Sequence, residues 1–269
     1  PERPLQGGAM RAGKVRVALA QFKAVLGDVT QNLENGVSLV RQAAAEKADI
    51  IVFPELCFTG YQMQMLGEQV HSLSDQWNDT IEDTLQKAAR AANMHIITGL
   101  CEKIDGTYYN TACLYNRAGE RTGCHRKNFA FGAERDYFTD GQELRTFDTD
   151  FGRIGMLICY DIGFPETARR LSLDGAEILF VPSAWRFEDK RAWELNIASR
   201  ALENQVYTVG VNHAGRFGDL RLFGRSCACG PAGNVLVQLG YDRQELKFCD
   251  LDLSVLEALH HRPGYRFDL

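Results

Sequence analysis

The sequence lacks a long apolar run, a dense cysteine framework and an excess of basic residues. No apolar run approaches the roughly 18 residues that a membrane-spanning helix needs. Eight cysteines among 269 residues are too few for a disulfide-stapled scaffold. The 30 basic and 35 acidic side chains give a net charge of −5, without the basic stripe of a nucleic-acid-binding protein. These absences predict a soluble cytoplasmic protein that binds neither membranes nor nucleic acids.

Segments that would divide the chain are also missing. No low-complexity stretch and no linker rich in Pro, Gly or Ser interrupts the sequence. Residues 1–14 lack the apolar centre of a signal peptide, so we expect them to form a flexible leader. We expect residues 15–269 to form a single domain, because their number fits one large layered α/β structure.

The cysteine and histidine positions do not form a metal-binding pattern. Cys227 and Cys229 are two residues apart on a predicted strand and should share one face, but no second pair at zinc-ligand spacing accompanies them. His260 and His261 are adjacent, so they would point to different sides of a helix or strand. We therefore expect no metal site.

Apolar, strand-like runs alternate with amphipathic stretches along the whole chain. The predicted strands cover residues 15–22, 49–55, 95–100, 111–116, 121–127, 153–161, 176–185, 206–212, 224–231, 234–240 and 245–253. The predicted helices cover residues 30–48, with Thr30 as N-cap, 75–93, a segment starting near Pro165, and 190–205. Many of these strands are solid β-branched runs, which is typical of strands covered on both faces. The pattern predicts mixed α/β layers.

The stretch GRIGMLICYDIGFPE, residues 152–166, carries Cys159 at the end of an apolar run and just before a predicted helix. A structural cysteine usually packs as a small apolar group in the middle of a strand. At a strand-to-helix corner the thiol is accessible from one end, and the backbone N–H groups of the next helix favour a negative sulfur. The placement indicates a nucleophile.

Other polar residues stand where apolar runs end, which is where sites gather in layered α/β folds. Glu55 and Asn212 each follow such a run, and Lys127 and Glu134 lie in the stretch CHRKNFAFGAERDYF. Taken alone, this lysine and this glutamate are typical of a solvated surface. Together with Cys159 they offer one chemistry: a carboxylate takes the thiol proton, the thiolate attacks a carbonyl carbon, and an ammonium faces the developing oxyanion.

From about Val15 to the C-terminal strands, the chain resembles the nitrilase-like carbon–nitrogen hydrolases. FPELCFTGY is similar to the family's glutamate motif, HRKNF to its lysine motif, and ICYDIGFPETARRLSLDGAEILFVPSAW to its cysteine motif. The resemblance implies a four-layer α-β-β-α sandwich in one domain. It also implies a homodimer, or a higher homo-oligomer, formed through the helices near 165–174 and 190–205, with the tail HHRPGYRFDL reaching across.

The resemblance also implies a role for each motif residue. Glu55 would be the general base and later the proton donor to the departing ammonia. Lys127 would stabilise the tetrahedral oxyanion together with the backbone N–H of Tyr160, and Cys159 would form a thioester acyl-enzyme. Glu134 would position the lysine and the substrate. Thiolate, carboxylate and ammonium supply all of this chemistry, so we expect no metal and no organic cofactor.

Two points of this assignment remain open at the level of sequence. The connection between Lys127 and Glu134 is shorter than in many relatives, which leaves Asp136 and Glu143 as alternatives for the second carboxylate. A Cys–His protease is also conceivable, with His125 or His213 as the partner of the thiol.

The expected reaction is the hydrolysis of a small linear amide to a carboxylate and ammonia. True nitrilases usually carry a tryptophan after the cysteine, whereas Tyr160-Asp161 resembles the amide and carbamoyl branches, and WELNIASRALENQ is similar to the corresponding stretch of omega-amidases. The alternatives are an N-carbamoyl hydrolase, then a nitrilase, and, from another class, a non-catalytic binding protein. The residues expected to bind the substrate are Tyr61, Phe131, Tyr160, Trp185 and Asn212.

Overall fold

The computed structural model describes residues 13–260 and residue 265. Most of the expected leader, residues 1–12, lies outside the described residues, as do residues 261–264 and 266–269 of the tail that was expected to reach across a dimer. The first strand begins at Lys14, one residue before the expected start of the domain.

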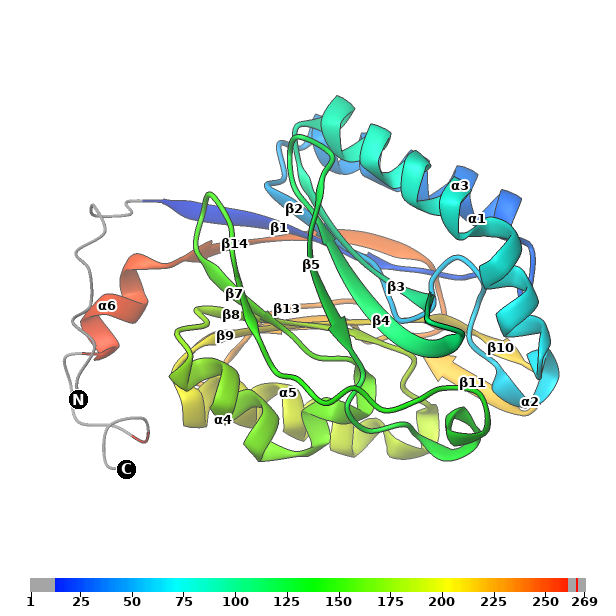
Figure 1. Ribbon diagram of the computed structural model, residues 1–269. Helices are drawn as coiled ribbons and strands as arrows, with labels where there is room; N and C mark the ends of the chain where they lie inside the picture. The colour runs from blue at the N-terminus through cyan, green and yellow to red at the C-terminus, as the bar shows by residue number, and fades with distance from the viewer. Residues whose placement is uncertain (1–12, 261–264, 266–269) are drawn as a thin grey trace.

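Two six-stranded sheets lie face to face, and helices cover the outer face of each (Figure 1). The first sheet has the order β14 (Glu245–Asp252), β1 (Lys14–Gln21), β2 (Ile50–Val52), β3 (His95–Ile104), β4 (Thr107–Tyr115) and β5 (Arg121–Arg126). The second has the order β13 (Val235–Gln238), β12 (Cys227–Cys229), β9 (Tyr207–Asn212), β8 (Ile178–Ser183), β7 (Arg153–Met156) and β6 (Thr146–Asp148).

Among the described residues, each outer layer of the sandwich consists of two helices, and two further short helices lie outside these layers. The helices are α1 (Val29–Ala45), α2 (Met63–Leu66), α3 (Gln69–Ala92), α4 (Pro165–Leu173), α5 (Lys190–Asn204) and α6 (Ser254–His260). Helices α1 and α3 pack on the first sheet, and α4 and α5 on the second (Figure 1). A small hairpin of β10 (Ala214–Phe217) and β11 (Leu220–Phe223) stands apart from both sheets. The predicted four-layer α-β-β-α sandwich is confirmed.

Burial on both faces explains the solid apolar runs of the inner strands. Along β1, Val17 and Leu19 point into the core between the two sheets, whereas Ala18 and Ala20 point into the core beneath α1 and α3. Successive side chains of a strand alternate between its faces, so a strand with a core on each side needs an apolar residue at every position. No helix among the described residues has the length and apolar character to cross a membrane.

The parallel strands bring their carboxyl ends to one region of the sandwich. In the first sheet β2 runs parallel to β1 and β3, and in the second β8 runs parallel to β7 and β9. A parallel bridge joins Phe22, just after β1, to His213, just after β9. The segments that follow β2, β7, β8 and β9 therefore share one edge of the molecule, where such folds place their sites.

Several local predictions need correction. Helix α1 is capped by Asp28, whose Oδ1 accepts from the Gln31 N–H over 3.0 Å, and Thr30 lies inside the helix. The strand predicted over residues 153–161 ends at Met156, because the chain turns into a 3-10 segment, Cys159–Gly163, before α4. Pro165 opens α4 as expected.

Candidate active site

Glu55, Lys127 and Glu134 form a buried charge cluster at this edge. Lys127 Nζ donates to Glu55 Oε1 and to Glu134 Oε1, each over 2.7 Å. Asn110 Nδ2 donates to Glu55 Oε1 over 2.6 Å, and the backbone N–H of Ala184 donates to Glu55 Oε2 over 2.9 Å. The three charged side chains are at most 2% exposed. An ammonium between two carboxylates satisfies charges that would otherwise be very costly to bury.

The turns that carry Glu55 and Cys159 are both strained. Leu56, directly after Glu55, has φ of 45°, and Cys159 itself has φ of 47°. Residues other than glycine rarely adopt this left-handed backbone conformation. It costs on the order of 1–3 kcal/mol and persists only where the surrounding structure enforces it. Strain of this kind is concentrated at functional sites.

Burial gives Glu55 the properties of a proton carrier near neutral pH. Removal from water raises the pKa of this carboxyl to about 7, and the nearby Lys127 ammonium only partly opposes the rise. The negative charge of Glu134 raises it further. An acid with such a pKa can accept a proton in one step and return it in the next.

The surroundings keep the Lys127 side chain charged and the Cys159 side chain neutral. Burial pulls the pKa of Lys127 down, but the carboxylates of Glu134 and Glu55 outweigh it and keep the pKa well above the usual lysine range. Burial raises the pKa of the Cys159 thiol well above its usual value, the charge of Glu55 adds to this, and Lys127 opposes it. The resting site therefore holds an ammonium and a neutral thiol that needs a base.

The predicted second carboxylate is the one that joins this cluster. Glu134 Oε1 also accepts from the Tyr61 hydroxyl, and Glu134 Oε2 accepts from the Phe131 N–H over 3.2 Å. Glu134 is fully buried. The alternatives are both exposed, and Glu143 pairs with Arg145 at the surface.

Cys159 lines a pocket of about 380 Å³. Four of the residues expected to bind the substrate, Tyr61, Phe131, Tyr160 and Trp185, line it as well. The edge of the Phe131 ring meets the ring of Tyr160 with centroids 5.1 Å apart. The Cys159 thiol is thus reached through a small pocket with aromatic walls. The charged side chains of Glu55, Lys127 and Glu134 are not among the residues that line this pocket.

The family model of carbon–nitrogen hydrolases matches residues 16–261. This chain belongs to the carbon–nitrogen hydrolase family. A nitrilase of Pyrococcus abyssi is 31% identical over 245 residues, which are 90% of this chain and 91% of the relative. The 2-oxoglutaramate amidase of Bacillus subtilis is 30% identical over 244 residues, which are 90% of this chain and 92% of that protein.

A solved structure extends the likeness to three dimensions. The amidase of Nesterenkonia sp. AN1, in a mutant with the acetamide moiety of fluoroacetamide added covalently at its active-site cysteine, matches with a TM-score of 0.86 and 25% identity. The match covers 98% of this chain and 97% of that one. Together these findings confirm the predicted family, fold and enzyme class, a carbon–nitrogen hydrolase.

In this carbon–nitrogen hydrolase, Asp161 links the 3-10 segment that begins at Cys159 to the residues that follow Lys127, a role that no sequence pattern predicts. Its Oδ1 accepts from the backbone N–H groups of Asn128 and Phe129, over 3.1 and 3.0 Å. Its Oδ2 accepts from the backbone N–H of Ile158 over 3.0 Å and lies 2.9 Å from His125 Nε2. The fully buried carboxylate thus holds the residues beside Lys127 against those beside Cys159.

Asn212 does not line the pocket, contrary to the prediction. It is fully buried behind the pocket wall, where its Oδ1 accepts from the Trp185 N–H over 2.7 Å and its Nδ2 donates to Trp185 O over 3.2 Å and Gly224 O over 2.9 Å. A side chain at the last position of a strand can point to either face of the sheet, and the Asn212 side chain points toward the backbone of Trp185 and Gly224. Asn212 therefore fixes the turn that presents Trp185.

The two histidines considered as protease partners are engaged elsewhere. His125 lies against Asp161, and His213 Nε2 donates to the backbone carbonyl of Glu55 over 2.7 Å. Burial lowers the pKa of His213 to about 4. The neutral His213 side chain thus stabilises the turn at Glu55 through this hydrogen bond. Within the described residues, no group of three or more His, Cys, Asp or Glu side chains is placed to hold a metal ion.

Proposed function

We propose that this protein hydrolyses small linear amides to a carboxylate and ammonia, with Cys159 as nucleophile, Glu55 as general base and Lys127 as oxyanion stabiliser. The observation that carries the proposal is the buried Lys127 ammonium between the Glu55 and Glu134 carboxylates, beside a thiol that opens onto a pocket. The amide chemistry in the names of relatives supports the same reaction.

Acylation begins when the Glu55 carboxylate takes the thiol proton. The Cys159 sulfur then bonds to the amide carbon, and the carbonyl oxygen becomes an oxyanion. Lys127 has three N–H donors and uses two on carboxylates in the described structure, so the third is available to this oxygen, assisted by the backbone N–H of Tyr160. The tetrahedral species collapses as the C–N bond breaks, and the nitrogen leaves as ammonia with the proton that Glu55 returns.

Deacylation uses the same groups with water in place of the thiol. Glu55 takes a proton from water, the hydroxide bonds to the thioester carbon, and the C–S bond breaks. The sulfur regains the proton from Glu55, and the carboxylic acid product leaves. Glu134 is held by Lys127, Tyr61 and the Phe131 N–H, and so keeps the ammonium aimed at the oxyanion.

The pocket favours an acyl group without charge. Its two charged lining residues are Arg186 and Asp189, and the Arg186 Nε donates to the Asp189 carboxylate. The guanidinium also lies over the Phe131 ring, 5.2 Å from its centroid. A carboxylate on the substrate would have to compete with Asp189 for the arginine, whereas an alkyl or aryl group meets the aromatic walls without such a cost.

The test is ammonia release from a matched panel of substrates. It pairs butyramide with succinamate, which differ by a terminal carboxylate, and adds an N-carbamoyl amino acid and butyronitrile. We expect turnover of butyramide above all others, lost in Cys159→Ala and kept in the control Cys249→Ala. Turnover of the carbamoyl compound with carbon dioxide release, or of the nitrile alone, would replace the amidase proposal. Butyramide turnover retained in Cys159→Ala would refute the nucleophile.

We further propose a homodimer in the cytoplasm. The eight cysteines are all free, which fits a reducing compartment. Leu173 of α4 and Leu195 and Leu202 of α5 are 57%, 49% and 42% exposed, and burial against a second copy would remove these apolar side chains from water. Analytical ultracentrifugation should give twice the 30.1 kDa chain mass, and Leu195→Glu with Leu202→Glu should return it to one.

A further inference from the structure

Two cysteines outside the active site lie opposite each other on adjacent strands of the first sheet. Cys113 on β4 and Cys124 on β5 are direct cross-strand partners, and their sulfur atoms are 3.1 Å apart. Cys113 is fully buried, whereas Cys124 is partly exposed. The sulfurs are in contact through an S–H···S hydrogen bond and are about 1 Å farther apart than in a disulfide.

The ladder geometry at this position suits a covalent bond. The Lys127 N–H donates to the Asn110 carbonyl over 2.8 Å, so these two residues are a hydrogen-bonded pair. Pairs alternate along an antiparallel ladder, which makes Cys113 and Cys124, three positions away on each strand, a non-hydrogen-bonded pair. Such pairs have Cα atoms about 4.5 Å apart, within the range of about 4.4–6.8 Å that disulfides span.

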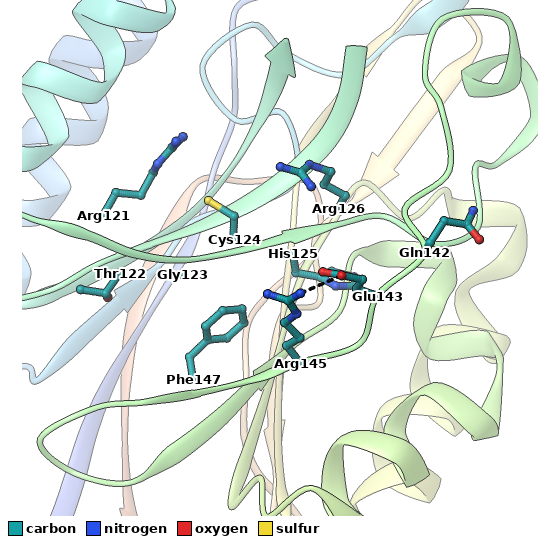
Figure 2. A pocket seen from close by; sticks show the side chains of 10 residues that line it. All are labelled: Arg121, Thr122, Gly123, Cys124, His125, Arg126, Gln142, Glu143, Arg145 and Phe147. Carbon is teal, nitrogen blue, oxygen red and sulfur yellow. Dashed lines mark hydrogen bonds and ion pairs between the residues drawn. The ribbon is translucent and has the colours of Figure 1, made fainter. Parts of the chain in front are cut away.

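Cys124 is the accessible member of the pair. It lines a pocket of about 370 Å³ and lies on β5 between Arg121 and Arg126 (Figure 2). The hydrogen bond from Cys113 lowers the pKa of Cys124, and Arg121 lowers it too, against the opposing effect of burial. Burial raises the pKa of Cys159 instead. The geometry therefore combines a partly exposed cysteine with a buried partner already in contact.

We propose that Cys113 and Cys124 are a reversible dithiol–disulfide site, oxidised by small hydroperoxides that enter the pocket beside β5. The Cys124 thiolate attacks the oxygen of the hydroperoxide that carries the hydrogen, the O–O bond breaks, and the alkoxide or hydroxide that leaves takes a proton to become alcohol or water. Cys124 is then a sulfenic acid. The Cys113 sulfur displaces its hydroxyl, which departs as water with the Cys113 proton, and the S–S bond forms. Two thiols have been oxidised and one peroxide reduced.

The site is independent of amide hydrolysis but lies beside its machinery. Strand β5 is at the edge of its sheet, pairs with β4 in the described structure, and ends one residue before Lys127. The disulfide would tie this edge strand covalently to β4. We therefore expect amides of β5 to exchange with solvent more slowly in the oxidised protein than in the reduced one.

The test is thiol mapping after mild peroxide treatment of the whole protein. Fully reduced protein receives a small molar excess of hydrogen peroxide, is unfolded and alkylated, and is then analysed by intact mass and by peptide mapping. We expect two of the eight thiols to escape alkylation, a linked peptide pair containing Cys113 and Cys124, and full recovery on adding dithiothreitol. The same result is expected in Cys159→Ala, since the nucleophile takes no part.

Variants separate the two thiols. Cys124→Ser should leave Cys113 alkylated after peroxide, and Cys113→Ser should leave a sulfenic acid on Cys124 that a dimedone probe traps. The control Cys227→Ser should still form the link. Peroxide that oxidises Cys159 or another thiol while Cys113 and Cys124 both stay alkylated would overturn the proposal. So would a link from either cysteine to a different partner in the wild-type protein.

Discussion

The pH dependence of acylation tests the role of Glu55 most directly. Burial raises its pKa to about 7, and the ionised form is the one that takes the thiol proton. The value of kcat/KM should therefore rise with pH through this region and level off above it. A single group with this pKa is about one tenth ionised at pH 6 and about nine tenths at pH 8, so kcat/KM should rise about tenfold between them. An ordinary glutamate would give a flat profile there.

The perturbation that isolates this carboxyl is Asn110→Ala. The Asn110 amide donates to Glu55 Oε1 and lowers the Glu55 pKa, so its loss should move the acid limb to higher pH. Asn116→Ala, which removes a partly exposed amide bonded to Glu120, is the control and should not move it. The assay is ammonia release from butyramide at low concentration, sampled at fixed times. A limb below pH 5, or one that Asn110→Ala leaves in place, would refute the reasoning.

Three further substitutions test other parts of the site. Asp189→Asn removes the ion-pair partner of Arg186, so kcat/KM for succinamate relative to butyramide should rise. The expected rise is about fivefold, which corresponds to about 1 kcal/mol from one partly exposed ion pair. An unchanged ratio would contradict the proposal that the pocket favours an uncharged acyl group. Asp161→Asn turns an amide toward backbone donors and His125, and should lower the free energy of unfolding by about 2–3 kcal/mol in urea titrations. Cys159→Ala should abolish covalent labelling by fluoroacetamide yet unfold at nearly the wild-type temperature, because it removes one small group.

The charge cluster could be anticipated because each of its members lies in a short, distinctive stretch of sequence. Glu55 and Lys127 follow β2 and β5, two strands of the first sheet that run in the same direction, and strand ends of one direction lie at one edge of a sheet. The part played by Asp161 was not visible, because three of its partners, Asn128, Phe129 and His125, lie more than 30 positions away along the chain. Asn212 was expected to bind the substrate but is not among the residues that line the pocket, since composition does not tell which face a strand's last side chain takes.

Short elements were the other gap between sequence and structure. The strand β6 and the hairpin of β10 and β11 are three or four residues long per strand, too short for an alternating pattern to stand out. The long helices α1, α3 and α5 repeat their apolar positions over several turns, and for that reason their existence was correctly predicted while their ends were off by up to six residues.

The carboxylate of Glu55 is shared between the two halves of the sandwich. One oxygen is held by Asn110 and Lys127 from the first sheet, and the other by Ala184 at the end of a strand in the second. A slip of one sheet over the other by a fraction of an ångström would stretch these bonds before any strand came apart. Enzymatic activity therefore depends on the alignment of the two sheets. It should be lost at a lower denaturant concentration than the secondary structure.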